Sequence, residues 1–206
     1  IDVFDKSELK HKHRVFLDEI GYKAGVYGYF HGSNTIDMKG FLLGTNHVED
    51  GKNTGKIDLL MLDLPALEEG KVKVLTKNTI TGHPAKTYMF RGHPTRDGKF
   101  LLRAGGDRMY LIDPVALKPI DETIVSGVND DVIPTPDGKY AVLTLRQTVK
   151  IKTEGGISKI TDGALQLYDI DEKKLIGKSV STCNACHIKT GIRRNAVFNG
   201  LEGNWR

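Results

Sequence analysis

The sequence has no apolar run of the ~18 residues that a membrane-spanning helix needs. The longest apolar stretch, residues 57–64, is interrupted by Asp58 and Asp63. Dense runs of lysine or arginine are also missing, and the formal net charge is only +4. We therefore expect a chain without a transmembrane segment and without a nucleic-acid partner.

Cysteine is scarce, because the chain has only two, and both lie in Cys183-Asn184-Ala185-Cys186-His187. A structural zinc site needs four ligands, and the sequence has no second C-x-x-C or H-x-x-x-H to complete one. A thioredoxin-type C-x-x-C lies early, between a strand and a helix, whereas only 19 residues follow His187 here. A redox disulfide stays open as the main alternative reading of these five residues.

The pentapeptide resembles the haem-attachment signature of c-type cytochromes. Two thiols one helical turn apart can add to the two vinyl groups of one porphyrin, and the adjacent imidazole then reaches the iron. The resemblance implies one covalent haem c, with Cys183 and Cys186 as thioether anchors and His187 as the proximal ligand. Arg193 and Arg194 follow the motif, where they either pair with propionates or form a solvated basic patch.

No methionine or histidine follows His187, although small cytochromes c commonly take their second axial ligand from a downstream methionine. A distal ligand must come from earlier in the chain, from a neighbouring chain or from outside, or the site is open. We rank His31 first, because it follows the aromatic run Tyr27-Gly28-Tyr29-Phe30, and then His93, His83 and His47. The intramolecular candidates are His11, His13, His31, His47, His83, His93, Met38, Met61, Met89 and Met109. Met61 and Met109 lie within predicted strands, where core packing is the simpler role.

The chain contains an internal repeat. The Pro-Thr-x-Asp-Gly-Lys turn and apolar strand at residues 94–102 recur at residues 134–142. Each copy continues to a strand that ends in aspartate, at residues 109–113 and 165–169. Residues 39–43 and 57–63 form a weaker first copy. Third strands are expected at residues 72–75 and 175–180.

This pattern is similar to the blades of β-propellers of the YVTN and lactonase-like families and of the haem-d domain of two-haem nitrite reductases. It implies a mainly β fold with three to four propeller-like blades, followed by a short C-terminal haem-binding segment. Since closed rings usually need at least four blades, we expect the ring to be incomplete or completed by a partner. Asp-Gly-Lys as a common hairpin turn remains the alternative.

We expect three regions in the chain. Residues 1–24 form an N-terminal arm or short helix, with Ser7 as a possible N-cap and apolar residues at roughly helical spacing. Residues 25–182 form the repeat region, including a long hairpin at residues 147–162. Residues 183–206 form the haem-attachment segment and tail.

The expected function is electron transfer by a monohaem c-type cytochrome that belongs to an oligomer or complex. Its partner would be another redox protein or other copies of the same chain. Covalent haem attachment is completed outside the cytoplasm and the chain begins with Ile1 rather than Met, so a periplasmic or extracellular location is expected. The alternative is a subunit of a periplasmic oxidoreductase, in which His83 and His93, with His31 or His47, hold a second metal or cofactor. No catalytic residue is assigned.

Overall fold

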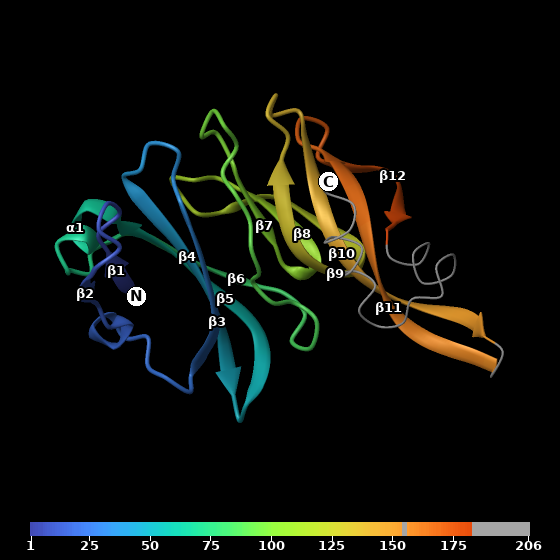
Figure 1. The fold of residues 1–206 in the computed structure, drawn as a ribbon, viewed down its shortest axis with the longest axis horizontal. Helices are drawn as coiled ribbons and strands as arrows, with labels where there is room; N and C mark the ends of the chain where they lie inside the picture. Colours follow the sequence, from blue (N-terminus) through green and yellow to red (C-terminus); the bar gives the residue numbers. More distant parts are fainter. Residues whose placement is uncertain (154–155, 183–206) are drawn as a thin grey trace.

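The computed structural model describes residues 1–153 and 156–182, and these form a mainly β structure (Figure 1). All sheets are antiparallel. A two-stranded sheet joins β1 (Asp2–Phe4) and β2 (His11–Arg14). A four-stranded sheet follows the chain order and contains β3 (Tyr27–Asn34), β4 (Gly40–Glu49), β5 (Lys52–Asp63) and β6 (Val74–Thr81). A six-stranded sheet contains β7 (Leu101–Ala104), β8 (Gly106–Ile112), β9 (Pro119–Pro134), β10 (Tyr140–Thr153), β11 (Gly156–Asp169) and β12 (Lys174–Ser181).

The six-stranded sheet is divided at the long strand β9. Its first half pairs with β8, as at Tyr110↔Glu122, and its second half pairs with β10, as at Val142↔Ile133. The segment 87–94 also runs along β7, where the Phe90 amide donates to the Ala104 carbonyl at 2.8 Å. The described chain therefore forms three successive four-stranded units. We call them the first blade (β3 to β6), the second blade (87–94, β7, β8 and the first half of β9) and the third blade (the second half of β9, β10, β11 and β12).

The three copies share one turn. A threonine hydroxyl donates to an aspartate two residues later, at 2.6 Å in Thr35–Asp37, 2.7 Å in Thr95–Asp97 and 2.6 Å in Thr135–Asp137. The residue after each aspartate has a left-handed backbone, with φ of 56° at Met38, 70° at Gly98 and 72° at Gly138. The weak first copy in the sequence is thus a full structural copy. The predicted propeller-like β fold is confirmed.

Apolar clusters lie between successive layers. Leu42, Leu59 and Met61 of the first blade pack with Tyr110 and Ile112 of the second. In the next layer, the equivalent residues Leu102, Met109 and Leu111 of the second blade pack against the third blade, where the cluster includes Val132, Leu143 and Tyr168. Serial packing of sheet faces is how propeller blades bury their apolar residues.

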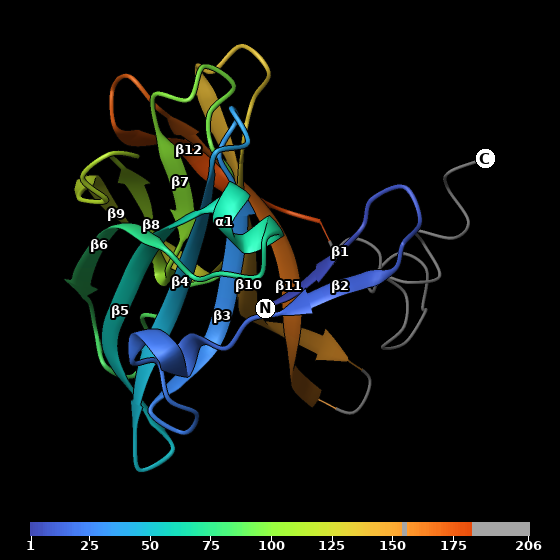
Figure 2. The ribbon, with the colours of Figure 1, turned by 90° about the vertical axis from the view of Figure 1, so that its left-hand side faces the viewer.

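The N-terminal residues cover the other face of the first blade (Figure 2). Val15 and Tyr22 are buried there with Leu43, Leu60 and Leu62, and the short helix α1 (Leu64–Glu68) adds Leu67. The side chain of Asp63 caps α1 by accepting a hydrogen bond from the Ala66 amide at 3.2 Å. The first blade is therefore closed on both faces by residues of this chain.

Of the two alternatives for the N-terminal region, an arm or a short helix, the helix is not formed and the residues make an arm. The segment forms the hairpin strand β2 and a 3-10 turn at Leu17–Ile20. Leu9 has a positive φ of 53°, and Leu9 and Phe16 are exposed whereas Val15 is buried. These side chains do not share one helical face, because the arm is shaped by its contact with the first blade rather than by local periodicity.

Two other expectations concern strand limits. The predicted strand at residues 72–75 overlaps β6 only at its last two residues. The long hairpin is confirmed, because β10 and β11 stay paired from Gln147↔Asp162 to Thr153↔Gly156. In the described ranges, no helix is long and apolar enough to cross a membrane.

Candidate functional site

The repeat places three polar residues at equivalent positions on the first strands of the blades. His31, Arg91 and Asp131 each precede the turn threonine of their copy, Thr35, Thr95 or Thr135, by four residues. Because the blades pack in series, equivalent positions on neighbouring first strands lie at a similar level. His31 belongs to β3, Arg91 to the segment 87–94 and Asp131 to β9.

Contacts join these positions. Asp131 Oδ2 lies 3.4 Å from Arg91 Nε, and Asp131 Oδ1 lies 3.5 Å from Nε2 of His93. The ring of His31 lies 5.9 Å from that of Phe90, between centroids. Asp131 is largely buried, with 16% of its side chain exposed, whereas Arg91 and His93 are about half exposed or more. The charges of Arg91 and Asp131 also act on His31. We therefore group His31, Arg91, His93 and Asp131 as one polar cluster, which contains the two histidines ranked first in the sequence.

Arg103 of β7 adds a buried positive charge. It is 1% exposed, and its Nη2 donates to Ser33 Oγ at 2.9 Å and to the Leu42 carbonyl at 3.4 Å. Its Nε and Nη1 are buried without a hydrogen-bond partner within the described part of the chain. Burial lowers the pKa of Arg103 to about 10, and the charge of Asp131 opposes this shift. The guanidinium remains charged at neutral pH, so the cluster has a positive local potential.

His31 is half-buried, and its surroundings favour the neutral imidazole. Burial lowers its pKa, the charges of Arg103 and Arg91 lower it further, and Asp131 acts in the opposite direction. A neutral imidazole keeps a lone pair for an iron atom or a hydrogen-bond donor. Burial and the two nearby arginine charges therefore favour the form of His31 that can act as a metal ligand.

His47 belongs to a separate polar group in the first blade. Its Nε2 lies 3.2 Å from Oδ1 of the buried Asp58, which also accepts hydrogen bonds from Tyr22 at 2.7 Å and Thr79 at 2.5 Å. The ring of Tyr27 packs on Tyr22 and on His47, with centroids 4.6 Å apart in both pairs. Tyr27 therefore does not form the aromatic wall expected beside His31. The side chains of Tyr29 and Phe30 lie outside the described part of the structure.

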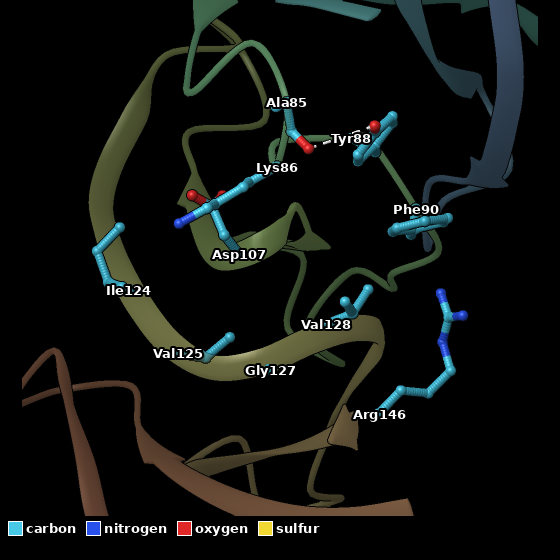
Figure 3. Close-up of a pocket in the computed structure, with 10 residues that line it drawn as sticks. All are labelled: Ala85, Lys86, Tyr88, Phe90, Asp107, Ile124, Val125, Gly127, Val128 and Arg146. Atoms are coloured by element: carbon cyan, nitrogen blue, oxygen red, sulfur yellow. Dashed lines mark hydrogen bonds between the residues drawn. The ribbon is translucent and has the colours of Figure 1, made fainter. Parts of the chain in front are cut away.

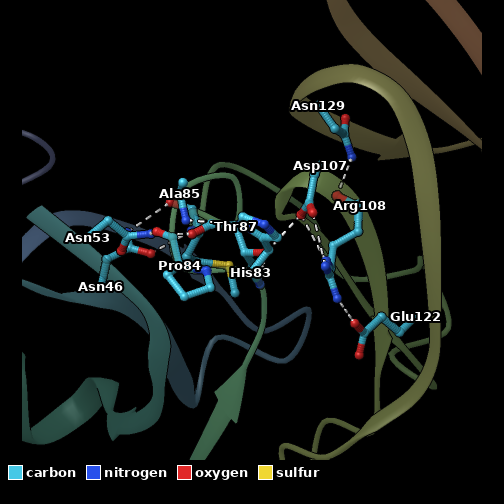
Figure 4. A network of polar contacts seen from close by, with 11 residues as sticks. Asn46, Asn53, His83, Pro84, Ala85, Thr87, Asp107, Arg108, Glu122 and Asn129 are labelled. Carbon is cyan, nitrogen blue, oxygen red and sulfur yellow. Dashed lines mark hydrogen bonds and ion pairs between the residues drawn. The ribbon is translucent and has the colours of Figure 1, made fainter.

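His83 lies in a network that ties the first blade to the second (Figure 4). Its Nδ1 accepts from the Ala85 amide at 3.1 Å, and its amide donates to Thr87 Oγ1 at 2.7 Å. Thr87 donates in turn to Asp107 at 2.8 Å, and Asn53 of β5 donates to the Thr87 carbonyl at 2.6 Å. These contacts organise a loop. The two Gly-His-Pro elements therefore have different surroundings. His83 contacts Ala85 and Thr87 of its own loop, whereas His93 contacts Asp131 of β9.

The remaining candidate ligands have structural surroundings. His11 lies 3.0 Å from Asp2, and the ring of His13 lies against Gly70, where a Cβ would approach it to 3.0 Å. Met38 is exposed in the first repeat turn. Three methionines are buried in the apolar clusters: Met61, Met89 and Met109. Core packing was the expectation for Met61 and Met109.

The alternative of a second metal site held by the histidines finds no support among the described residues. In residues 1–153 and 156–182, no group of three or more His, Cys, Asp or Glu side chains could hold a metal ion. His47 and His83 lie in separate polar groups, and His31 and His93 share only one carboxylate neighbour. The copper-type arrangement of His83 and His93 with His31 or His47 therefore does not fit the described residues.

A cavity of about 770 Å³ lies beside the cluster (Figure 3). Phe90 connects the two, because it lines the cavity and contacts the ring of His31. The walls are apolar and aromatic, with Lys86, Arg146 and Asp107 as charged groups. The lining residues are Ala85, Lys86, Tyr88, Phe90, Asp107, Ile124, Val125, Gly127, Val128 and Arg146.

The predicted haem-attachment residues Cys183, Cys186 and His187 lie outside the described residues, as do Arg193 and Arg194. The described chain reaches Thr182, directly after β12.

Sequence reasoning missed Arg91, Asp131 and Arg103. Counting back four residues from the turn threonine of each copy would have identified the first two, because the repeat fixes their register. The burial of Arg103 had no local signal, since it directly follows two apolar strand residues and arginine is usually exposed.

Comparisons with known proteins give no family. No family model matches the chain, and no curated protein matches it. Among solved structures, it is similar to the hydrazine synthase of Kuenenia stuttgartiensis, with 14% identity, a TM-score of 0.43, and 79% of this chain and 51% of that chain covered. It is also similar to the dihydro-heme d1 dehydrogenase NirN in complex with DHE, with 18% identity, a TM-score of 0.47, and 88% and 33% covered. The chain thus spans about half and one third of these proteins. Both TM-scores are below 0.5.

Proposed function

We propose that the protein is a monohaem c-type electron carrier that works within a redox complex or assembly. The observation that carries the proposal is the placement of the only two cysteines in one C-x-x-C-H motif. Cys183 and Cys186 bind the haem covalently, and His187 is its proximal ligand. Bound haem supplies reversible one-electron exchange.

His31 is the first candidate for the distal position. Its support is the half-buried ring, whose lowered pKa favours the neutral imidazole, and the neighbouring exposed Arg91, whose charge suits a propionate. His93 is the second candidate. Asp131 positions His93 and Arg91 through contacts of 3.5 and 3.4 Å.

The proposed location is the periplasm or the cell exterior, because covalent haem c attachment is completed there. The proposed partner is another redox protein or another copy of this chain.

Metal analysis and a potentiometric titration test this function. We expect one iron per chain, no stoichiometric copper and a single one-electron transition. A His31→Ala variant should alter the low-spin spectrum of the oxidised protein, whereas a variant of the structurally engaged His47 should leave it unchanged. An iron-free protein, or one without a reversible transition, would contradict the proposal.

A second candidate function is a redox-enzyme subunit with an additional non-covalent cofactor. The cavity of about 770 Å³ beside Phe90 favours it, since this volume lies in the usual range of small-molecule sites. The test is denaturing extraction of the purified protein followed by mass spectrometry. A stoichiometric small molecule in the extract would support this function, and an extract without one would reject it.

A further inference from the structure

The third blade exposes the face that the first two blades bury. Leu102, Met109 and Leu111 of the second blade are fully buried against the third. By the repeat register, Val142, Leu165 and Leu167 take these positions in the third blade. Leu165 and Leu167 are each 42% exposed. In the second blade this face is covered by the third blade. The third blade has no such cover among the described residues, so its apolar face stays exposed.

Cross-strand pairing makes this face continuous. Ile133 pairs with Val142, Val142 with Leu167, and Leu167 with Ile176, so one apolar row crosses all four strands. A second row runs from Val180 through Leu165 and Thr144 to Asp131. Ile133 is 48% and Val180 is 65% exposed. We call this surface the open face, and its residues are Ile133, Val142, Leu165, Leu167, Ile176 and Val180.

We infer that the open face is the docking surface for the chain's own residues 183–206, with the haem that they carry. The inference rests on the proposed function for the haem. The position of β12 supports it, because this strand ends at Ser181, next to Val180 at one end of the second row. Asp131 stands at the other end, in contact with Arg91 and His93.

The distances permit this path. Three strand spacings separate Val180 from Asp131, which is about 14 Å. The six residues that follow Ser181, up to His187, span up to roughly 20 Å when extended. The rows therefore connect the end of the described chain with the cluster that contains His31 and His93. This path gives the haem an apolar support and a route to its candidate distal ligands.

The occupant is the tail rather than a second copy of the chain. A stable interface between two protein chains buries about 1,200–2,000 Å² in total, whereas the open face is a patch of six apolar side chains, none of them more than 65% exposed. A segment tethered one residue beyond β12 needs no such area, because its effective concentration at the face is high. Its apolar residues complement the face: Ile188, Ile192, Ala196, Val197, Phe198, Leu201 and Trp205.

Limited proteolysis of the holoprotein, with residues 1–206 intact, tests this docking. Trypsin can cleave after Lys189, Arg193 and Arg194, all within the tail. The test variant is Leu165→Thr with Leu167→Thr, which keeps β propensity while removing apolar surface. Leu167→Thr alone is the milder variant. The matched control is Val115→Thr, since Val115 is 78% exposed in the turn after β8.

We expect the test variants to release tail peptides at least tenfold faster than the wild type, and the control to match the wild type. Equal rates in all proteins would overturn the docking. A wild-type dimer by light scattering that the double variant converts to monomer would also overturn it, in favour of a second copy. Covalent haem is measured separately on the denatured protein, so its absence would reject the proposed function while the proteolysis still reports on the face.

Discussion

The carboxylate of Asp131 lies 3.4 Å from the guanidinium of Arg91, and the two residues hold the same position in successive copies of the repeat. The first copy has His31 at this position. The repeat therefore places a carboxylate (Asp131), a guanidinium (Arg91) and an imidazole (His31) at equivalent positions of three similar sheets. Arg91 and Arg103 carry two positive charges, and the negative charge of Asp131 offsets them only in part. The electrostatic potential around His31 is therefore positive.

The pKa of His31 should respond in opposite directions to two substitutions. Arg103→Met removes a charge that lowers this pKa, so the pKa should rise, whereas Asp131→Asn removes a charge that raises it, so the pKa should fall. NMR titration in the haem-free Cys183→Ala/Cys186→Ala chain measures both. The same direction of change in both variants would show that Arg103 and Asp131 do not act on His31 as described.

His31 should make the haem-free chain less stable in mild acid. Its folded-state pKa is below the ordinary value of 6.5, so the unfolded chain binds more protons as the pH falls through that value. The free energy of unfolding should decrease below about pH 6.5 and level off below the folded-state pKa. In His31→Gln, urea unfolding should show a smaller loss between about pH 7 and pH 5. An unchanged loss would count against the burial of this imidazole.

Tyr22 and Asp58 attach the N-terminal arm to the first blade. Burial alone would raise the pKa of Asp58, but hydrogen bonds from Thr79 and Tyr22, together with the nearby His47 and Lys77, outweigh burial and lower it. Tyr22→Phe should reduce the free energy of unfolding by about 1.5 to 3 kcal/mol, because a hydrogen bond to a charged group is lost. Urea unfolding at neutral pH measures the loss. Tyr140→Phe, at a more exposed tyrosine, should change stability little, and an equal loss there would show that the effect is not specific to Asp58.

Met38 should be replaceable with a gain in stability. Its φ is 56°, and the equivalent residues in the other two copies are glycines with φ of 70° and 72°. Met38→Gly should raise the free energy of unfolding by up to about 1 kcal/mol, because the left-handed backbone strains any residue with a Cβ. Gly98→Met should lower stability. Thermal melts of both variants check the signs, and a destabilised Met38→Gly protein would contradict this reading of the turn.

Much of the fold could be predicted, because the repeat carries it. The Asp-Gly-Lys turns and the strands that end in aspartate predict the blades. The long hairpin is predicted because more residues separate the two strands of the third copy than of the second. The N-terminal arm could not be predicted from periodicity, since Val15 and Tyr22 are fixed by contacts with residues far along the chain. Only part of the candidate site could be predicted from the sequence. His31 and His93 were selected as residue types that bind iron, whereas Asp131 and Arg103 act through burial and proximity, which only the packed blades create.

The covalent attachment of haem to Cys183 and Cys186 is the central claim, and acidic acetone extraction followed by a pyridine haemochrome spectrum tests it most directly. We expect the colour to stay with the protein and to show a c-type α-band, and we expect Cys183→Ala/Cys186→Ala to abolish both. Haem that extracts into acetone, or a wild-type protein without an α-band, would contradict the account.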